Sequence, residues 1–384
     1  MRKMLFSAIL LAAVLFYLLR AGSNLYTQQE SFSLKKSVLN WMPVAGSAVA
    51  VLKDEILVEN KHITLELSTA FRHLGSDHFG LLTHRGENIE FRWFDSGGNA
   101  AGLIQERWPA DLALPRYMLD RRNNRLIAVD MLNRLRIFRN DGTLESENQI
   151  FDGYQYNTEN SIYTTFVESA RYLFCALTQV FPNPQEFPGY KTILKTIDLA
   201  GNSRFTAELE GWQINALDSR DDGQLHVVSL YRYDPAQDNF YFKVRMYDGE
   251  GKIIHDLDQS FRKLVFGGQE SVLMLDKDSG VIFDLSQGEI TGIYRLTNAE
   301  RILMTAEYIS ARDSYIIEAG NLSQAENRWL YTDVSLVSID RKAGILDTMS
   351  LDTLNVYHPV LNYDRQLNQV FIGHSSGWIR LQVN

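Results

Sequence analysis

A strand–turn–strand unit that recurs along the chain constrains the fold more than any other feature of the sequence. Each copy has a strand of alternating apolar residues, a turn with Asp or Asn and Gly, and a second strand. The copies are spaced by roughly 35 to 60 residues, which suits one four-stranded blade per copy in a β-propeller. The turns lie at Asp95–Gly97, Asn140–Gly142, Asp198–Gly201, Asp248–Gly249, Asp284–Gly288 and Asp340–Gly344.

The rest of the chain fits the same all-β class. After residue 19 no long window keeps a helical period, whereas period-2 runs bounded by Gly, Asn and Asp are frequent. The C-terminus supplies three strands, at 356–363, 369–373 and 378–383, and a blade needs a fourth strand to avoid an open edge. We expect residues 56–67 to provide it. The sequence therefore predicts a seven-bladed all-β propeller over residues 49–384, although six or eight blades also fit.

The N-terminus reads as a targeting segment over residues 1–20. Arg2 and Lys3 precede an unbroken apolar run at 4–19, and Arg20 ends that run. The run suits either a cleaved signal peptide or an uncleaved anchor, and we favour an apolar helix that anchors the chain to a membrane. The charges place the body outside the cytoplasm, on a periplasmic or extracellular face. Residues 21–48 are expected to be a tether.

Composition excludes some classes of partner. The net charge is −9, which does not suit nucleic acid, because a phosphate backbone requires a basic surface. Cys175 is the single cysteine, so no internal disulfide can form. It lies in an apolar run with no cation beside it in the sequence, which indicates a buried structural thiol rather than a nucleophile.

One blade resembles a known repeat. Residues 124–144 contain a strand ending in Val129-Asp130, an Asn133-Arg134 turn, and an Ile-Phe strand leading to Asp141-Gly142. This pattern resembles the NHL repeat over about one blade, and residues 222–249 resemble it loosely. The resemblance implies an NHL-like propeller. Related propeller enzymes use metal-binding residues in the central channel, and their ligand set does not match this sequence.

Motifs for catalysis and metal binding are sparse. The sequence lacks a Gly-x-Ser-x-Gly elbow, a phosphate-binding Gly-Lys-Ser loop and a His-Glu-x-x-His motif. His73, Asp77, His78 and His84 lie close in sequence, but their spacing fits no standard site on one strand or helix. We therefore predict no metal site and no resident cofactor.

The first residues of the innermost strands are the better candidates for a ligand site, since they face the mouth of a propeller's channel. A ring of Arg and His there could hold a carboxylate, which Arg binds through two hydrogen bonds. Ordinary polar residues of a wet rim would look the same. The candidates are Arg116, Asn215, Arg262, Arg301 and His358.

These features favour a binding or scaffolding module for a protein partner, tethered to a membrane outside the cytoplasm. Aromatic stretches at 231–233 and 240–242 suit either an interface or packing between blades. The alternative is a metal-dependent hydrolase or lactonase at the channel mouth, acting on a small anionic substrate with a divalent cation. A solute-binding sensor without turnover is a third hypothesis. Whether the protein is an enzyme stays undecided, because propellers host many functions.

Overall fold

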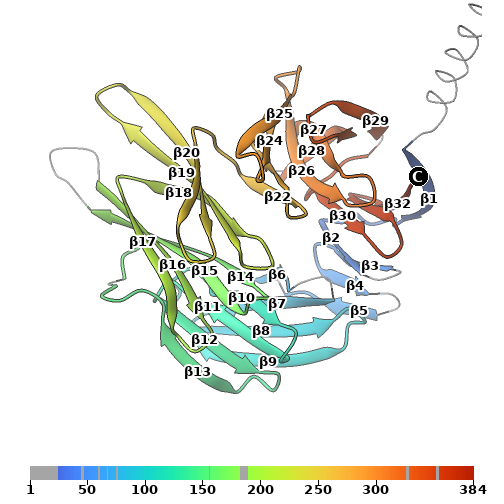
Figure 1. Ribbon diagram of the computed structural model, residues 1–384. Helices are drawn as coiled ribbons and strands as arrows, with labels where there is room; N and C mark the ends of the chain where they lie inside the picture. Colours follow the sequence, from blue (N-terminus) through green and yellow to red (C-terminus); the bar gives the residue numbers. More distant parts are fainter. Residues whose placement is uncertain are drawn as a thin grey trace, which may run out of the picture. The chain divides into compact units, whose positions relative to one another are not determined.

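The computed structural model describes residues 25–384 except 45–46, 59–60, 67, 75–76, 155, 182–188, 326–327 and 352–353. Every regular element among the described residues is a β-strand, and the strands form eight sheets of four (Figure 1). Neighbouring strands with assigned registers pair antiparallel. We call the sheets blades 1 to 8, in the order in which their first strands follow along the chain.

The chain divides into two compact units, and the larger, Trp41–Arg295, contains the first six blades apart from Asn40. Blades 1 to 3 are, in turn, β2 (Asn40–Val44), β3 (Ser47–Val51), β4 (Glu55–Val58) and β5 (Lys61–Thr64); β6 (Thr69–His73), β7 (His78–Arg85), β8 (Asn88–Asp95) and β9 (Ala100–Arg107); β10 (Arg116–Asp120), β11 (Arg125–Val129), β12 (Arg134–Arg139) and β13 (Leu144–Gln149).

Blades 4 to 6 have the same strand order but longer central hairpins in blades 4 and 5. Their strands are β14 (Ser161–Val167), β15 (Tyr172–Phe181), β16 (Gly189–Asp198) and β17 (Ser203–Glu210); β18 (Gln213–Ser219), β19 (Leu225–Asp234), β20 (Asn239–Asp248) and β21 (Ile253–Leu257); β22 (Lys263–Gly267), β23 (Ser271–Leu275), β24 (Ser279–Asp284) and β25 (Glu289–Arg295).

The smaller unit joins Met1–Asn40 to Leu296–Asn384 and contains the last two blades. Blade 8 is completed by the first described strand of the chain, β1 (Tyr26–Ser33), which pairs with β32. The other strands are β26 (Arg301–Ile309), β27 (Ser314–Ala325), β28 (Arg328–Ile339) and β29 (Ile345–Leu351) in blade 7, and β30 (Val360–Asp364), β31 (Gln369–His374) and β32 (Gly377–Val383) in blade 8.

Burial distinguishes the inner and outer strands of a blade. The middle strands are almost wholly buried, as in β23, whereas the last strand alternates between exposed and half-buried residues, as in β13. The first strands pack against one another, as β14 does with β18 and β26 with β30. Apolar residues of one blade pack on the next, and the rings of Phe91 and Tyr117 stack at 3.9 Å between blades 2 and 3. The first strands are therefore the inner ones.

The predicted number of blades and the predicted closing strand are both wrong. The structure has eight blades, and residues 56–67 do not close the last one, because β4 and β5 belong to blade 1. The closing strand is β1, which lies with β2 in the stretch expected to be a tether. The register of β1 on β32 runs from Tyr26 opposite Val383 to Ser33 opposite Gly377, which leaves no open outer edge on β32.

The expected N-terminal helix needs correction as well. Residues 1–24, which include the apolar run at 4–19, lie outside the described residues, and the described part of the chain consists of strands, turns and loops. No helix in that part is long and apolar enough to cross a membrane.

Candidate functional site

Four charged residues on inner strands of the larger unit form what we call the inner-strand charge cluster. They are Arg72 on β6, Arg116 on β10, Asp218 on β18 and Lys263 on β22. Arg116 links the group, because its charge acts on both Arg72 and Asp218, and the charge of Lys263 also acts on Asp218. Three cations and one carboxylate on inner strands of four blades thus influence one another through their charges.

Asp218 is the unusual member of this cluster. Burial raises the pKa of its carboxyl to about 6, even though the Ser219 N–H at 2.8 Å and the charges of Lys263 and Arg116 favour the ionised form. Arg72 is half-buried, and burial together with the charge of Arg116 lowers its pKa. Perturbed groups of this kind gather at functional sites more often than elsewhere, which makes the cluster a candidate binding site.

Three of the five predicted site residues lie in the larger unit, and Arg116 belongs to the charge cluster. Asn215 lies at a bulge in β18, and its Nδ2 donates to the Phe261 carbonyl at 2.7 Å, which joins blade 5 to the loop before β22. The N–H of Arg262 donates to the Leu275 carbonyl, and its Nε lies 3.5 Å from Asp276 Oδ1. Asn215 and Arg262 therefore have contacts that stabilise the fold.

The other two predicted site residues lie in the smaller unit. Arg301 Nη2 donates to the carbonyls of Ala319 and Asp333, each at 3.0 Å, and to Ser335 Oγ at 2.6 Å. These bonds hold the side chain against its own blade. His358 lies in the segment before β30, where partial burial of its ring and, secondarily, the charge of nearby Arg328 lower its pKa. Neither contact points to a ligand.

Sequence reasoning missed Arg72, Asp218 and Lys263. Lys263 directly follows the candidate Arg262, and Asp218 lies on the same strand as the candidate Asn215, whereas no candidate was chosen near Arg72. One signal could have found them. Each is a charged residue within the first strand of its blade, where most side chains are apolar or small.

The histidine group in blade 2 does not form a metal site. His73 ends β6, His78 begins β7, and His78 Nδ1 lies 3.1 Å from Asp77 Oδ1. Within the described residues, no three His, Cys, Asp or Glu side chains are arranged to hold a metal ion.

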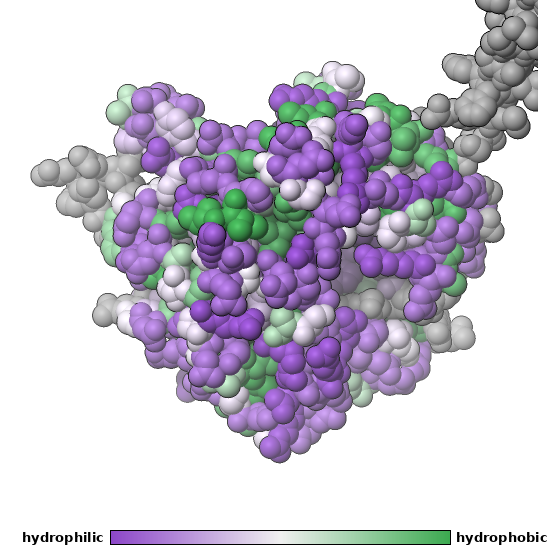
Figure 2. Space-filling view, viewed as in Figure 1, coloured by the Kyte–Doolittle hydropathy of each residue, from purple (hydrophilic) through white to green (hydrophobic). Residues whose placement is uncertain are grey.

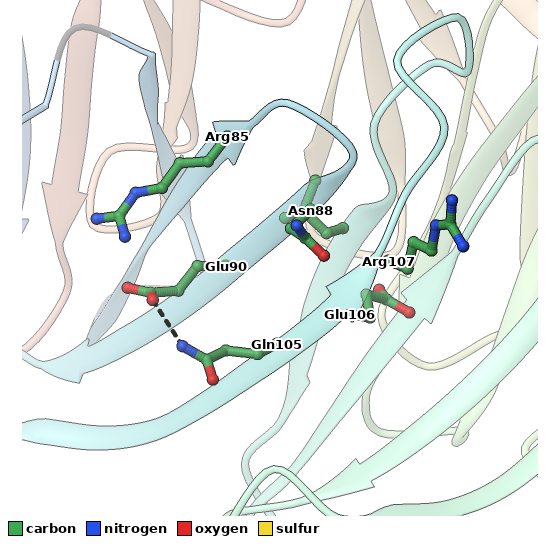
Figure 3. A pocket seen from close by; sticks show the side chains of 7 residues that line it. Arg85, Asn88, Glu90, Gln105, Glu106 and Arg107 are labelled. Atoms are coloured by element: carbon green, nitrogen blue, oxygen red, sulfur yellow. Dashed lines mark hydrogen bonds between the residues drawn. The ribbon is translucent and has the colours of Figure 1, made fainter.

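A pocket of about 410 Å³ on blade 2 is lined mainly by charged and amide side chains (Figure 3). Glu90 accepts a hydrogen bond from Gln105 at 2.9 Å and pairs with Arg92 at 2.7 Å, while Arg85 and Arg107 lie at opposite ends of the pocket. Arg85 pairs with Glu66, and Arg107 pairs with Glu87. Because its charged side chains already have ion-pair partners, this pocket is a poorer candidate than the inner-strand cluster.

A second candidate surface lies on the hairpin of β19 and β20, which extends past the other strands of blade 5 (yellow in Figure 1). Tyr231 pairs with Phe242 and Tyr233 with Phe240, so all four rings lie on one face. We call these residues the aromatic face. Phe240 is 52% exposed and Phe242 is 45% exposed. Figure 2 shows hydrophobic side chains at the surface where β18–β20 run in Figure 1.

The opposite face of this hairpin carries the basic residues Arg232 and Lys243, which both contact neighbouring side chains. The Arg232 guanidinium lies 4.9 Å from the ring centre of Trp212 and 5.2 Å from that of Tyr241. Lys243 lies over the same Trp212 ring at 5.8 Å and pairs with Asp256 at 3.2 Å. These contacts fix the hairpin, and they hold the aromatic face in one arrangement without a partner.

The hairpin also has a backbone edge. The pairing of β20 with β21 starts at Val244, so among the described residues no strand lies beside 239–243 on that side. An edge of this kind presents N–H and C=O groups that can pair with another chain.

Comparison with solved structures identifies the architecture. The C-terminal WD40 domain of Sif2 aligns with a TM-score of 0.55 and 13% identity, covering 94% of this chain and 98% of that one. The structure of BBS1N in complex with ARL6DN aligns with a TM-score of 0.45 and 8% identity, covering 94% and 97%. The Sif2 alignment confirms the predicted β-propeller class and shows that the fold is WD40-like. In this protein the described strands form eight blades.

The comparisons do not confirm the NHL resemblance. No family model matches the chain, and no curated protein matches its sequence. At 13% identity, the Sif2 alignment shows a shared fold and nothing about activity.

Proposed function

We propose that this propeller is a binding module that holds a protein partner on the β19–β20 hairpin. The observation that carries the proposal is the exposed aromatic face beside the backbone edge at 239–243. Propellers commonly serve as interaction modules, and aromatic side chains are enriched where proteins bind one another.

The chemistry of the hairpin defines the partner segment. An extended segment can pair with the edge of β20, and its alternate side chains would then cover Phe240 and Phe242. The side chains in between would face Arg232 and Lys243, where acidic residues fit best. The partner is therefore an extended protein segment that alternates apolar and acidic residues.

The test compares the full chain with the double variant Phe240→Ser and Phe242→Ser in affinity capture from cells that express the protein. The control is Ile253→Ser with Ile254→Ser, which alters two exposed apolar residues of β21 in the same blade, at 46% and 39% exposure. The proposal expects a protein captured by the wild type and the control to be lost from the hairpin variant.

Retention of the same proteins by all three chains would refute the proposal. Sedimentation equilibrium distinguishes a second case, in which the hairpin variant alone loses self-association. That outcome would assign the aromatic face to another copy of this chain instead of a different protein.

We also propose that residues 4–19 hold the module at a membrane, with the propeller outside the cytoplasm. The support is the apolar run between Arg2-Lys3 and Arg20. The full chain should stay with membranes through an alkaline wash, and a chain without residues 1–20 should be released. Recovery of the full chain in the soluble fraction would contradict anchoring. No observation favours the hydrolase alternative.

A further inference from the structure

A pocket of about 430 Å³ lies where blade 3 connects to blade 4, within the larger unit. One wall is the loop that joins β13 to β14, and the other is the end of β15. None of the described residues that line the pocket carries a charge. Small-molecule sites usually have volumes of about 300 to 1,000 Å³, so the pocket has room for a small uncharged ligand.

The register of β15 places two lining side chains on one face of the strand. Leu177, Gln179 and Phe181 are alternate residues and therefore share a face. Leu177 belongs to a buried cluster that also contains Ile150 and Phe151 from the start of the connecting loop. Gln179 and Phe181 continue this face past the cluster, and Phe181 is 49% exposed. An amide and an aromatic ring thus follow the core where the pocket opens.

Hydrogen bonds hold the connecting loop against the strand. Asn160 is 6% exposed, and its Oδ1 accepts the Val180 N–H at 3.1 Å. The Asn157 carbonyl accepts the Asn160 N–H at 3.1 Å, and Asn157 Oδ1 accepts the Glu159 N–H at 3.0 Å. The wall that carries Tyr156 and Asn157 is therefore held in place without a ligand, which lowers the entropic cost of binding one.

Three polar groups of the pocket remain available to a ligand. Among the described residues, the Tyr156 hydroxyl, Asn157 Nδ2 and the Gln179 amide have no hydrogen-bond partner. All three can donate, and the hydroxyl and the Gln179 carbonyl oxygen can also accept. Two exposed rings accompany them, since Tyr156 is 38% exposed and Phe181 is 49% exposed. The pocket thus offers hydrogen bonds to hydroxyl groups and ring faces to an apolar surface.

The charges around the pocket disfavour an anionic ligand. Asp152 and Glu159 lie in the connecting loop beside lining residues, and the Asp152 side chain is 97% exposed. Lys191, which lies opposite Gln179 in the hairpin, is paired with Glu208 at 2.8 Å. The net charge of −9 adds to the repulsion of anions.

We propose that this pocket binds a neutral saccharide. The sugar hydroxyls form hydrogen bonds with Gln179, Asn157 and Tyr156, and the apolar C–H face of a sugar ring lies on the Phe181 ring. A nucleobase also stacks on aromatic rings, but the phosphate of a nucleotide would be repelled by the nearby carboxylates. This site is separate from the aromatic face of the β19–β20 hairpin, so it can fail or hold independently of the protein partner.

The experiment probes an array of neutral mono-, di- and oligosaccharides with the full chain, in a detergent without a sugar headgroup. Sialylated and sulfated glycans on the same array provide the acidic comparison, and adenosine is titrated separately. Saturation-transfer NMR with the tightest-binding saccharide identifies the protons that contact the protein. We expect binding of neutral saccharides, with the strongest transfer at C–H protons on one face of a ring.

Variants connect the binding to the residues. Phe181→Ser should weaken saccharide binding about tenfold, because it removes the ring on which the sugar lies. Gln179→Ala should weaken it about threefold or more through the loss of a hydrogen bond. Tyr190→Ser is the matched control, because Tyr190 lies opposite Val180 and so on the other face of the same hairpin. It should bind like the wild type, and thermal unfolding of each variant establishes that it is folded.

Absence of binding to every neutral saccharide on the array would overturn the proposal. So would equal affinity in the wild type and in folded Phe181→Ser and Gln179→Ala. Tighter binding of acidic glycans or of adenosine than of any neutral saccharide would assign the pocket to another class of ligand and would also overturn it. If neither variant folds, Tyr156→Phe removes only a hydroxyl at the exposed end of the pocket and provides the same comparison.

Discussion

At the scale of single residues, His226 shows how a buried polar group can be structural. The imidazole is 0% exposed, between the rings of Phe174 and Phe205. Its Nδ1 lies 2.6 Å from Ser219 Oγ and its Nε2 lies 3.1 Å from the Tyr172 hydroxyl. Because that hydroxyl donates to the Gly223 carbonyl at 2.8 Å, it must accept from His226, so Nε2 carries the hydrogen of a neutral ring.

This network predicts a loss of stability in mild acid. Burial, and secondarily the charge of Arg204, lowers the pKa of His226 to about 4. In the unfolded chain His226 takes up a proton near pH 6.5, whereas in the folded chain it stays neutral down to about pH 4. The contribution of neutral His226 to the free energy of unfolding is therefore complete above pH 6.5 and declines between about pH 6.5 and pH 4. Between pH 7.5 and pH 5 the wild type should lose about 2 kcal/mol more unfolding free energy than His226→Gln.

Urea unfolding at the two pH values measures this difference. Both chains share every other titrating group, so the subtraction isolates His226. Equal losses in the two chains would mean that the ring ionises normally in the folded state, and would argue against the neutral network.

At the scale of elements, the turn between the third and fourth strands is the repeated device of these blades. Asp198 Oδ1 accepts the N–H of Asn202 at 2.8 Å, and Asp248 and Asp340 bond the fourth following residue at the same distance. The residue three after the Asp has a positive φ, as at Gly201 and Gly251. In blade 7 this position is Ala343, with φ of 61°.

Ala343→Gly should therefore stabilise the protein. An L-residue in the left-handed region is strained by Cβ, and glycine removes this strain at some cost in unfolded-chain entropy. We expect a gain of about 1 kcal/mol in the free energy of unfolding.

The matched control is Gly86→Ala at φ of 62°, in the turn between β7 and β8, where an added Cβ meets no atom within 4 Å. Gly86→Ala should lower the free energy of unfolding by about as much as Ala343→Gly raises it. Denaturant unfolding measures both changes. A lower free energy of unfolding in Ala343→Gly would show that contacts of the Ala343 side chain stabilise the protein more than its backbone strain destabilises it.

The turns were also the part of the fold that the sequence predicted best. Asp and Gly act locally, so their spacing in the sequence maps directly onto a hairpin. The buried thiol of Cys175 was predicted correctly for the same reason, from the apolar residues beside it. In the predicted turn Asp340–Gly344 of blade 7, the residue with positive φ is Ala343 rather than the glycine.

The charge cluster was harder to predict because its members come from four blades. Arg72 and Lys263 are far apart in the sequence, so no local pattern indicates that they belong to the same group. Which side chain of a strand faces inward depends on the strand register, which the sequence does not define to one residue. For the same reason Arg301 was selected, although its guanidinium bonds to Ser335 and to two carbonyls of its own blade.

At the scale of the whole molecule, β1 explains why the number of blades was underestimated. Its sequence, YTQQESFS, is mostly polar, and its exposed residues resemble a linker. An outer strand needs few apolar residues, because its other edge and much of its surface face solvent. The closing strand was sought among the more apolar residues 56–67, which are instead needed for blade 1.

Removing β1 should therefore destabilise the smaller unit. The deletion takes away the strand paired with β32, the buried Tyr26 with its 2.6 Å bond to Ser338, and the stacking of Phe32 on Trp378. Loss of one buried aromatic side chain alone costs about 3 kcal/mol. A chain lacking residues 1–33 should unfold at a lower temperature than a chain lacking residues 1–24, which keeps β1. Hydrogen exchange in β32 localises the effect, since its outer amides lose their partners. Equal melting temperatures and equal protection of β32 would show that β1 does not close blade 8.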